Sequence, residues 1–164
     1  MGILKKIKDR ILDTGQGVEE NTYAPPRQEV DWRVIPYKED YFFPAASKTT
    51  WAQGPQWYQE ALQRAGTKVK KFYLVPEPEN RYDSNAVSIF AVVGKDMVRI
   101  GRLHGSEESL SLTQKLIYRE NAAGRNVACV GHVFMSPSDG LRVEIFVTGI
   151  DWLRNEMAPK TKAP

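Results

Sequence analysis

Short apolar runs separated by turn residues dominate the pattern from about residue 50 onward. Alternation of apolar and polar positions, bounded by glycine, proline or aspartate, is typical of half-buried strands. The predicted strands are Trp51 to Tyr58, Val69 to Val75, Ala86 to Val93, Met97 to Leu103, Asn126 to Met135 and Leu141 to Gly149. Gly94-Lys95-Asp96 and Ser136-Pro-Ser-Asp-Gly140 each separate two of these strands, which predicts two hairpins.

Two segments of the same region follow a helical period instead. Tyr58 to Ala65 predicts one to two turns of helix that end at Gly66. Ser106 to Asn121 has apolar residues at near-helical spacing, and Ser106 followed by two glutamates is a favourable N-terminal cap. Short strands with two or three short helices predict a mainly β, α+β protein. Its expected form is a small OB-like, partly open antiparallel β-barrel.

The ends of the chain follow different patterns. Residues 1–14 predict a basic amphipathic helix with an apolar stripe formed by Ile3, Leu4, Ile7 and Ile11. Such a stripe predicts docking on the chain itself, on a protein partner or on an anionic membrane surface. Residues 15–50, rich in proline and aromatic residues without a sustained period, predict an extended arm that packs partly on the domain. The barrel domain is then expected over 51–153, and a disordered tail over 154–164.

Composition restricts the class of protein. The chain has 164 residues, of which 41% are hydrophobic and 26% charged, and this favours one compact domain with peripheral segments. A single cysteine, Cys129, allows no internal disulfide. No run approaches the roughly 20 apolar residues of a membrane-spanning helix, and the N-terminus lacks the apolar core of a secretory signal. These features predict a cytoplasmic protein.

Candidate catalytic residues do not form a recognisable arrangement. The histidines and the cysteine are His104, His132 and Cys129. Their spacing matches no zinc-binding or nucleophile motif. Glu77, Glu79 and Asp83 are close enough in sequence for a Mg²⁺-dependent nuclease site, but the two glutamates alternate with prolines and no lysine motif completes the set. We therefore expect a non-enzymatic protein without a cofactor or metal ion.

The segment Pro76-Glu-Pro-Glu-Asn-Arg-Tyr-Asp-Ser-Asn-Ala-Val87 carries more specialised residues than a chain reversal needs. It places two prolines, two asparagines, an aspartate and a tyrosine at the entrance of an apolar strand. The net charge of +3 is too small to indicate nucleic-acid binding by itself. Basic residues nevertheless cluster around this segment: Lys68, Lys70, Lys71, Arg81, Arg99 and Arg102. The cluster predicts a local surface for phosphate groups, although solvated strand edges also use lysine.

Three segments resemble the successive signatures of the HIRAN domain: Gly54-Pro-Gln-Trp-Tyr-Gln-Glu-Ala-Leu62, the segment from Pro76 to Val87, and Ile100-Gly-Arg-Leu103. In that family a glycine with two aromatic residues opens the first strand. A Pro-Asn-Pro-Tyr-Asp-x-Asn-Ala-Val/Ile loop follows, and a Val-Gly-Tyr/His-Leu strand precedes a helix. The resemblance spans about Trp51 to Gly149. It implies an OB-like barrel that captures the 3′ end of single-stranded DNA in helicase-like fork-remodelling enzymes. A role in DNA repair or replication follows, here as a stand-alone module.

The resemblance also implies roles for individual residues. Trp57 and Tyr82 take the positions of two aromatic residues that sandwich the terminal bases, and Asp83 that of a carboxylate that accepts a hydrogen bond from the 3′-hydroxyl. Arg102 takes the position of a polar residue in the same pocket. Gln56 stands where DNA-binding members have an arginine, so one phosphate contact is missing. A base stacked on an aromatic ring contributes about 1 to 3 kcal/mol. A carboxylate accepts from a hydroxyl but repels a terminal phosphate.

The same residues also have purely structural interpretations. Asp83 and Asn85 are typical turn and cap residues, and the side chain of Asn85 is predicted to hold the loop backbone. Trp57 fits a barrel core equally well. Lys71 and Arg81, with their basic neighbours, would offset the charge of Asp83 near a DNA backbone. Two functions therefore stay open: a binder of single-stranded DNA ends, and a protein-interaction or scaffold module that uses the groove, the N-terminal helix or the arm.

Overall fold

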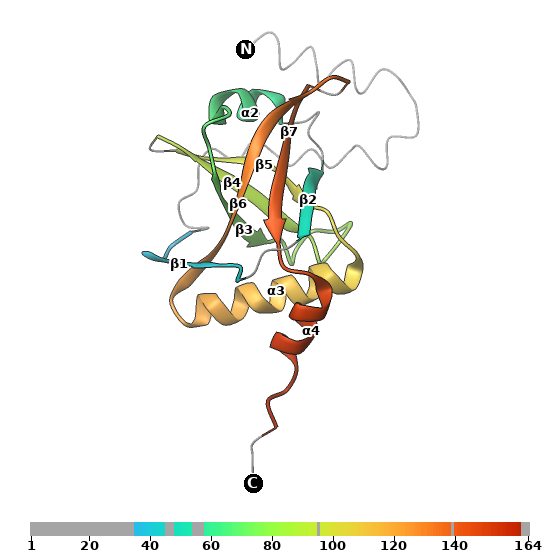
Figure 1. Ribbon diagram of the computed structural model, residues 1–164. Coiled ribbons are helices and arrows are strands. Elements are labelled where there is room, and N and C mark those ends of the chain that lie inside the picture. Colours follow the sequence, from blue (N-terminus) through green and yellow to red (C-terminus); the bar gives the residue numbers. More distant parts are fainter. Residues whose placement is uncertain (1–34, 45–47, 54–57, 95, 139, 162–164) are drawn as a thin grey trace.

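The computed structural model describes residues 35–44, 48–53, 58–94, 96–138 and 140–161 (Figure 1). The predicted fold class is confirmed, because this part of the protein is mainly β with three helices. In chain order, the helices and strands are β1 (Glu39–Phe42), β2 (Lys48–Gln53), α2 (Gln59–Ala65), β3 (Lys71–Pro76), β4 (Val87–Val93), β5 (Asp96–Leu103), α3 (Glu107–Ala122), β6 (Arg125–Ser136), β7 (Gly140–Val147) and α4 (Ile150–Met157).

Strands β2 to β7 close into an antiparallel barrel. Their order around the barrel is β6-β3-β4-β5-β2-β7, and pairing of β6 with β7 completes the ring. This closure depends on the 12-residue length of β6, which pairs with β3 through its first half and with β7 through its second half. Outside the ring, β1 pairs in parallel with β6. The arrangement is consistent with an OB-like barrel.

The hydrophobic core fills the barrel and extends under two helices. Phe72 of β3, Ile89 of β4 and Ile145 of β7 are fully buried inside it, as the alternation along their strands requires. Leu62 of α2 and Leu116 of α3 are fully buried in the same cluster. In Figure 1, α2 lies near the upper end of the barrel and α3 crosses the lower end. The two helices therefore cover opposite ends of one core.

Helix α4 lies in a region where the sequence predicts the end of the barrel and the start of a tail. Its Arg154 forms two hydrogen bonds to the carboxylate of Glu108 on α3, at 2.7 and 2.8 Å. Its Glu156 accepts from Arg119 of α3 at 2.6 Å. A helix of this length is marginal alone, so it depends on such tertiary contacts, which leave no local signal in the sequence.

The two predicted hairpins and the two predicted helices of the barrel region are present in the structure. The strand predicted from Trp51 to Tyr58 differs, because β2 begins at Lys48 and Tyr58 is a buried residue directly before α2. Strand β1 lies in the arm, where no regular element is predicted. Its parallel pairing with β6 is a long-range contact, and the four residues of β1 are too few to show a period.

Some predictions concern residues outside the described part of the chain. These residues are Ile3, Leu4, Ile7 and Ile11 of the amphipathic helix, the site candidates Gln56 and Trp57, and the turn residue Lys95. In the described ranges, none of the helices has the length and apolar character needed to cross a membrane.

Candidate nucleic-acid interface

The loop of residues 77–86, between β3 and β4, is built from two consecutive turns. The amide of Asn80 donates to the carbonyl of Glu77 at 3.0 Å, and the amide of Ala86 donates to the carbonyl of Asp83 at 3.0 Å. At the base of the loop, the amide of Glu77 donates to the carbonyl of Ala86 at 2.8 Å. The specialised segment of the sequence is therefore a closed, internally bonded loop.

Asn80 holds the centre of this loop. Its side-chain oxygen accepts from the amides of Tyr82 at 2.9 Å and Asp83 at 3.2 Å. Its side-chain nitrogen donates to Glu77 Oε2 at 3.0 Å, and the residue is only 8% exposed. The sequence predicts that the side chain of Asn85 holds the loop backbone, but in the structure the side chain of Asn80 does so. Both are asparagines in a turn, and only the fold determines which of them points inward.

A buried ion pair lies beneath the loop. Glu77 pairs with Arg99 and accepts a hydrogen bond from the hydroxyl of Ser88. The side chains of Glu77 and Arg99 are 10% and 13% exposed. Arg99 therefore neutralises a buried carboxylate instead of facing phosphate groups. The carboxylate of Glu77 is already held by Arg99 and Ser88. The described residues contain no group of three or more His, Cys, Asp or Glu side chains that could hold a metal ion.

Helix α3 fixes the far side of the loop through Gln114. The side-chain nitrogen of this buried residue donates to the carbonyl of Ser84 at 2.9 Å and to the carbonyl of Ala86 at 3.0 Å. The loop is thus hydrogen-bonded to β4 through Ser88 and to α3 through Gln114, and the side chain of Asn80 links its own backbone internally. A loop held in this way keeps its outer side chains in a preformed arrangement, which lowers the entropy that binding has to overcome.

Tyr82 and Asp83 lie at the outer side of this frame. Tyr82 is 57% exposed, whereas Asp83 is half-buried. Asp83 Oδ1 accepts from the amide of Asn85 at 2.9 Å. The second carboxylate oxygen of Asp83 has no hydrogen bond within the described part of the chain. The loop thus presents an aromatic ring and a carboxylate oxygen from consecutive residues.

No family model, curated protein or solved structure matches this chain. The resemblance to the HIRAN domain accordingly depends on the motif residues alone.

Arg102 lies beside the strand that the loop enters. It occupies β5, opposite Ser88 on one side and opposite Gln53 of β2 on the other. Since the next residue, Leu103, is buried in the barrel core, the side chain of Arg102 lies on the outer face. The region around the loop thus includes one of the predicted cations on a rigid strand.

The other two basic candidates have different surroundings. Arg81 is exposed on the loop itself, next to Tyr82. Lys71 is the first residue of β3, whereas the loop follows the opposite end of that six-residue strand, roughly 16 Å away at about 3.3 Å per residue. The ammonium of Lys71 forms an ion pair with Asp40 at 2.9 Å. The structure therefore separates Lys71 from the loop.

Lys71 belongs to a group that joins the arm to the barrel, which we call the arm latch. Asn126 Nδ2 donates to the carbonyl of Tyr37 at 2.8 Å and to Asp40 Oδ1 at 3.0 Å. Asp40 Oδ2 accepts from Lys71 Nζ and from the hydroxyl of Tyr73, both at 2.9 Å. The arm latch consists of Tyr37, Asp40, Lys71, Tyr73 and Asn126.

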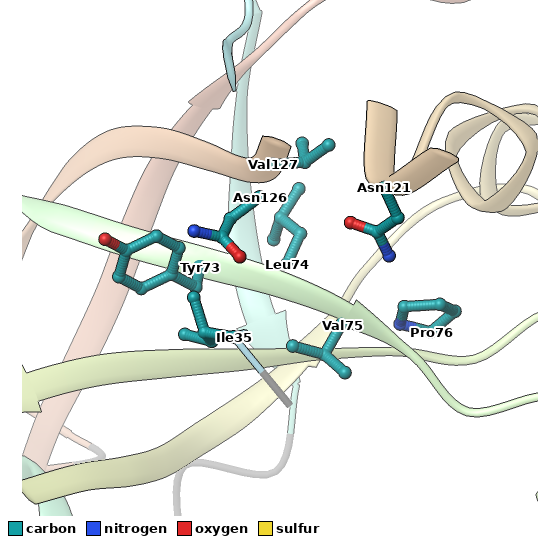
Figure 2. A pocket seen from close by; sticks show the side chains of 8 residues that line it. All are labelled: Ile35, Tyr73, Leu74, Val75, Pro76, Asn121, Asn126 and Val127. Atoms are coloured by element: carbon teal, nitrogen blue, oxygen red, sulfur yellow. The ribbon is translucent and has the colours of Figure 1, made fainter. Parts of the chain in front are cut away.

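Two cavities lie elsewhere on the protein, away from the outer side of the loop. Figure 2 shows Ile35, Tyr73 and Asn126 around a recess of about 10 Å³, which is room for about one water molecule. A larger cavity of about 150 Å³ lies between the first turns of α3 and α4 and the barrel strands, and Thr148 lines it. Neither cavity includes Tyr82 or Asp83.

Proposed function

We propose that this protein is a non-catalytic module that binds single-stranded DNA at its 3′-hydroxyl end, with Tyr82 and Asp83 in contact with the terminal nucleotide. One observation carries the proposal. An exposed ring and an uncommitted carboxylate oxygen follow one another on a loop that is fixed by Asn80, Gln114 and the Glu77 ion pair. A turn needed only to reverse the chain requires no exposed aromatic ring at this position.

The two side chains supply complementary chemistry. An aromatic ring stacks on any base, and each stacked base contributes about 1 to 3 kcal/mol without demanding a particular sequence. A carboxylate accepts a hydrogen bond from a hydroxyl but repels a terminal phosphate, which carries about 1.5 to 2 negative charges. Arg81 and Arg102 offset the repulsion between Asp83 and the internucleotide phosphates.

The HIRAN resemblance of the segment from Pro76 to Val87 adds support, because it assigns end recognition to the same two residues. Gln56, at the position of an arginine in DNA-binding members, implies weaker phosphate binding in this chain. Salt should therefore have a modest effect on affinity, since few phosphates are neutralised.

Asp83→Asn tests whether the carboxylate of Asp83 distinguishes a 3′-hydroxyl from a 3′-phosphate. Asparagine keeps an oxygen that can accept from the amide of Asn85, so the loop should keep its shape while the negative charge is lost. Fluorescence anisotropy with matched oligonucleotides that end in a 3′-hydroxyl or a 3′-phosphate should show that the wild type prefers the hydroxyl by about tenfold or more, equivalent to about 1.4 kcal/mol. In Asp83→Asn this preference should largely disappear.

Tyr82→Ala completes the same experiment. Loss of the ring should weaken binding of the hydroxyl strand by about five- to a hundredfold, the loss of one stacked base. Tyr118→Ala is the matched control, because Tyr118 is a comparably exposed aromatic residue on α3, at 45%. An absence of strand binding at low salt would refute the proposal, as would a preference for the hydroxyl that survives in Asp83→Asn.

A further inference from the structure

Four rings form a continuous surface on the outer side of the barrel, across β2, β6 and β7. We call the side chains of Trp51, His132, Phe134 and Phe146 the aromatic face. The ring centroids of Trp51 and Phe134 are 5.6 Å apart, and those of His132 and Phe134 are 5.5 Å apart. The ring of Phe146 lies 6.3 Å from that of His132. Interplanar angles of 39° to 57° mean that none of these contacts is a parallel stack, so the rings do not cover one another's faces.

The aromatic face is not part of the barrel core. Thr50 and Ala52, on either side of Trp51, are buried at 7% and 4% exposure, whereas Trp51 is 44% exposed. Val133, between two other rings of the face, is buried in the core at 3%. Strand alternation therefore directs the rings outward. Trp51 is the exposed ring of this group, and His132, Phe134 and Phe146 are half-buried. A contiguous group of partly exposed aromatic side chains is typical of an interaction surface.

Charged groups within the aromatic face are already arranged around its rings. The guanidinium carbon of Arg142 lies 5.5 Å from the centre of the Trp51 ring. Glu144, opposite both Trp51 and His132 in the sheet, places its carboxylate 3.3 Å from His132 Nε2. The carboxylate of Glu144 thus has a histidine partner, and the guanidinium of Arg142 lies over the most exposed ring.

Cations also lie on both sides of the aromatic face. The carbonyl of Lys70 accepts from the amide of Gly131 at 3.0 Å, which places this exposed lysine beside β6, next to His132. On the opposite side, Arg102 of β5 is paired with Gln53 of β2, two residues after Trp51. Rings bordered by cations match a strand of flat bases joined by phosphates better than they match an uncharged protein surface.

The same arginine connects the aromatic face to the loop. Arg102 lies opposite Ser88 on β4, the strand that follows the loop, and opposite Gln53 on β2, the strand that carries Trp51. At about 4.8 Å between neighbouring strands, β4 and β2 are roughly 10 Å apart around the barrel. A single strand whose last nucleotide contacts Tyr82 therefore has a short outer path past Arg102 to Trp51.

We infer that the aromatic face binds interior nucleotides of the single strand by base stacking, while the loop contacts its 3′ end. This inference rests on the proposed function for the nature of the ligand, but it concerns different residues and a different part of the strand. It adds a second binding element that needs no free end.

A circular oligonucleotide separates the two elements, because it has no 3′ end. We suggest a closed circle of about 30 nucleotides, longer than the roughly 4 to 16 nucleotides that one OB fold contacts. The full-length wild type should bind the circle, and Trp51→Ala and Phe134→Ala should each weaken this binding by about five- to a hundredfold. The control Tyr118→Ala, at an exposed aromatic residue on α3, should leave it unchanged. Trp51→Phe, which keeps a ring, should retain most of the affinity, and thermal unfolding of each variant checks that it is folded.

The possible results separate the two hypotheses. If the circle binds and Trp51→Ala weakens this binding, the aromatic face is supported. This holds even if strands with a 3′-hydroxyl and a 3′-phosphate bind equally, which would refute end recognition alone. If linear strands show the hydroxyl preference but the circle does not bind, or binds Trp51→Ala as well as wild type, the aromatic face is refuted while the proposed function stands. If no strand binds and Trp51→Ala instead abolishes self-association or binding of a protein partner, the nucleic-acid inference is overturned.

Discussion

Thr148 carries a buried hydroxyl that has no hydrogen-bond partner among the described residues. The residue is 4% exposed and lines the cavity of about 150 Å³ beside the first turns of α3 and α4. A buried hydroxyl without a hydrogen bond costs about 1 to 3 kcal/mol. Thr148→Val, which replaces the hydroxyl by a methyl group of similar size, should therefore raise the free energy of unfolding by about 1 kcal/mol, measured by urea denaturation.

Thr113→Val is the matched control for this prediction. Thr113 is equally buried, at 3% exposure, but its hydroxyl donates to the carbonyl of Ser109 at 2.7 Å. Loss of this bond should lower the free energy of unfolding by about 0.5 to 1.5 kcal/mol. The two threonine substitutions should thus have opposite signs. Equal destabilisation by both would mean that the Thr148 hydroxyl has a partner in solution.

At the scale of the element, the loop of residues 77–86 depends on Asn80. Asn80→Ala removes the acceptor of two amides and one donor to Glu77, so the free energy of unfolding should fall by about 1 to 3 kcal/mol. Asn85→Ala is the control, because the side chain of Asn85 has no hydrogen bond within the described part of the chain, and its effect should stay within about 0.5 kcal/mol. Urea denaturation measures both. A larger loss in free energy of unfolding for Asn85→Ala than for Asn80→Ala would mean that Asn85 holds the loop backbone, as the sequence predicts.

The elements differ in how far the sequence predicts them. Barrel strands and α3 were predictable because alternation and capping are local, and Ser106 indeed accepts from the amide of Ser109 at 3.2 Å. Helix α4 was not, since it is stabilised by ion pairs with α3. The loop was recognisable as specialised, yet its inner contacts were not. Glu77 looked like a possible metal ligand and Arg99 like a phosphate contact, and only the fold brings them together.

At the scale of the whole molecule, the barrel's closure creates surfaces that no segment shows alone. Trp51 and Phe134 are far apart in the chain and become neighbours only because β2 and β6 both pair with β7. The arm is tied to the barrel in the same non-local way, through the arm latch and through Ile35, which is buried against Tyr73 and Phe90. Predicting such contacts requires the strand order, which the sequence pattern does not contain.

Asp40 makes the arm latch sensitive to acid. Burial alone raises the pKa of Asp40, but hydrogen bonds from Asn126, Lys71 and Tyr73 outweigh it, so the pKa lies below its ordinary value of 3.8. A carboxyl group whose pKa is lower in the folded than in the unfolded state binds fewer protons when folded. Its contribution to stability is complete above the unfolded-state pKa, near 3.9, and is lost as the pH falls through the folded-state pKa.

Asp40→Asn should therefore destabilise the protein at neutral pH and progressively less in acid. Protonated Asp40 resembles asparagine, so the difference in free energy of unfolding between wild type and variant should be constant above about pH 5 and should narrow as the pH falls below about 4. Urea denaturation at a series of pH values measures this difference. Glu39→Gln, at the exposed neighbouring position on β1, is the control and should show no such narrowing. A difference for Asp40→Asn that stays constant down to the lowest pH at which the protein folds would show that the Asp40 charge does not hold the arm.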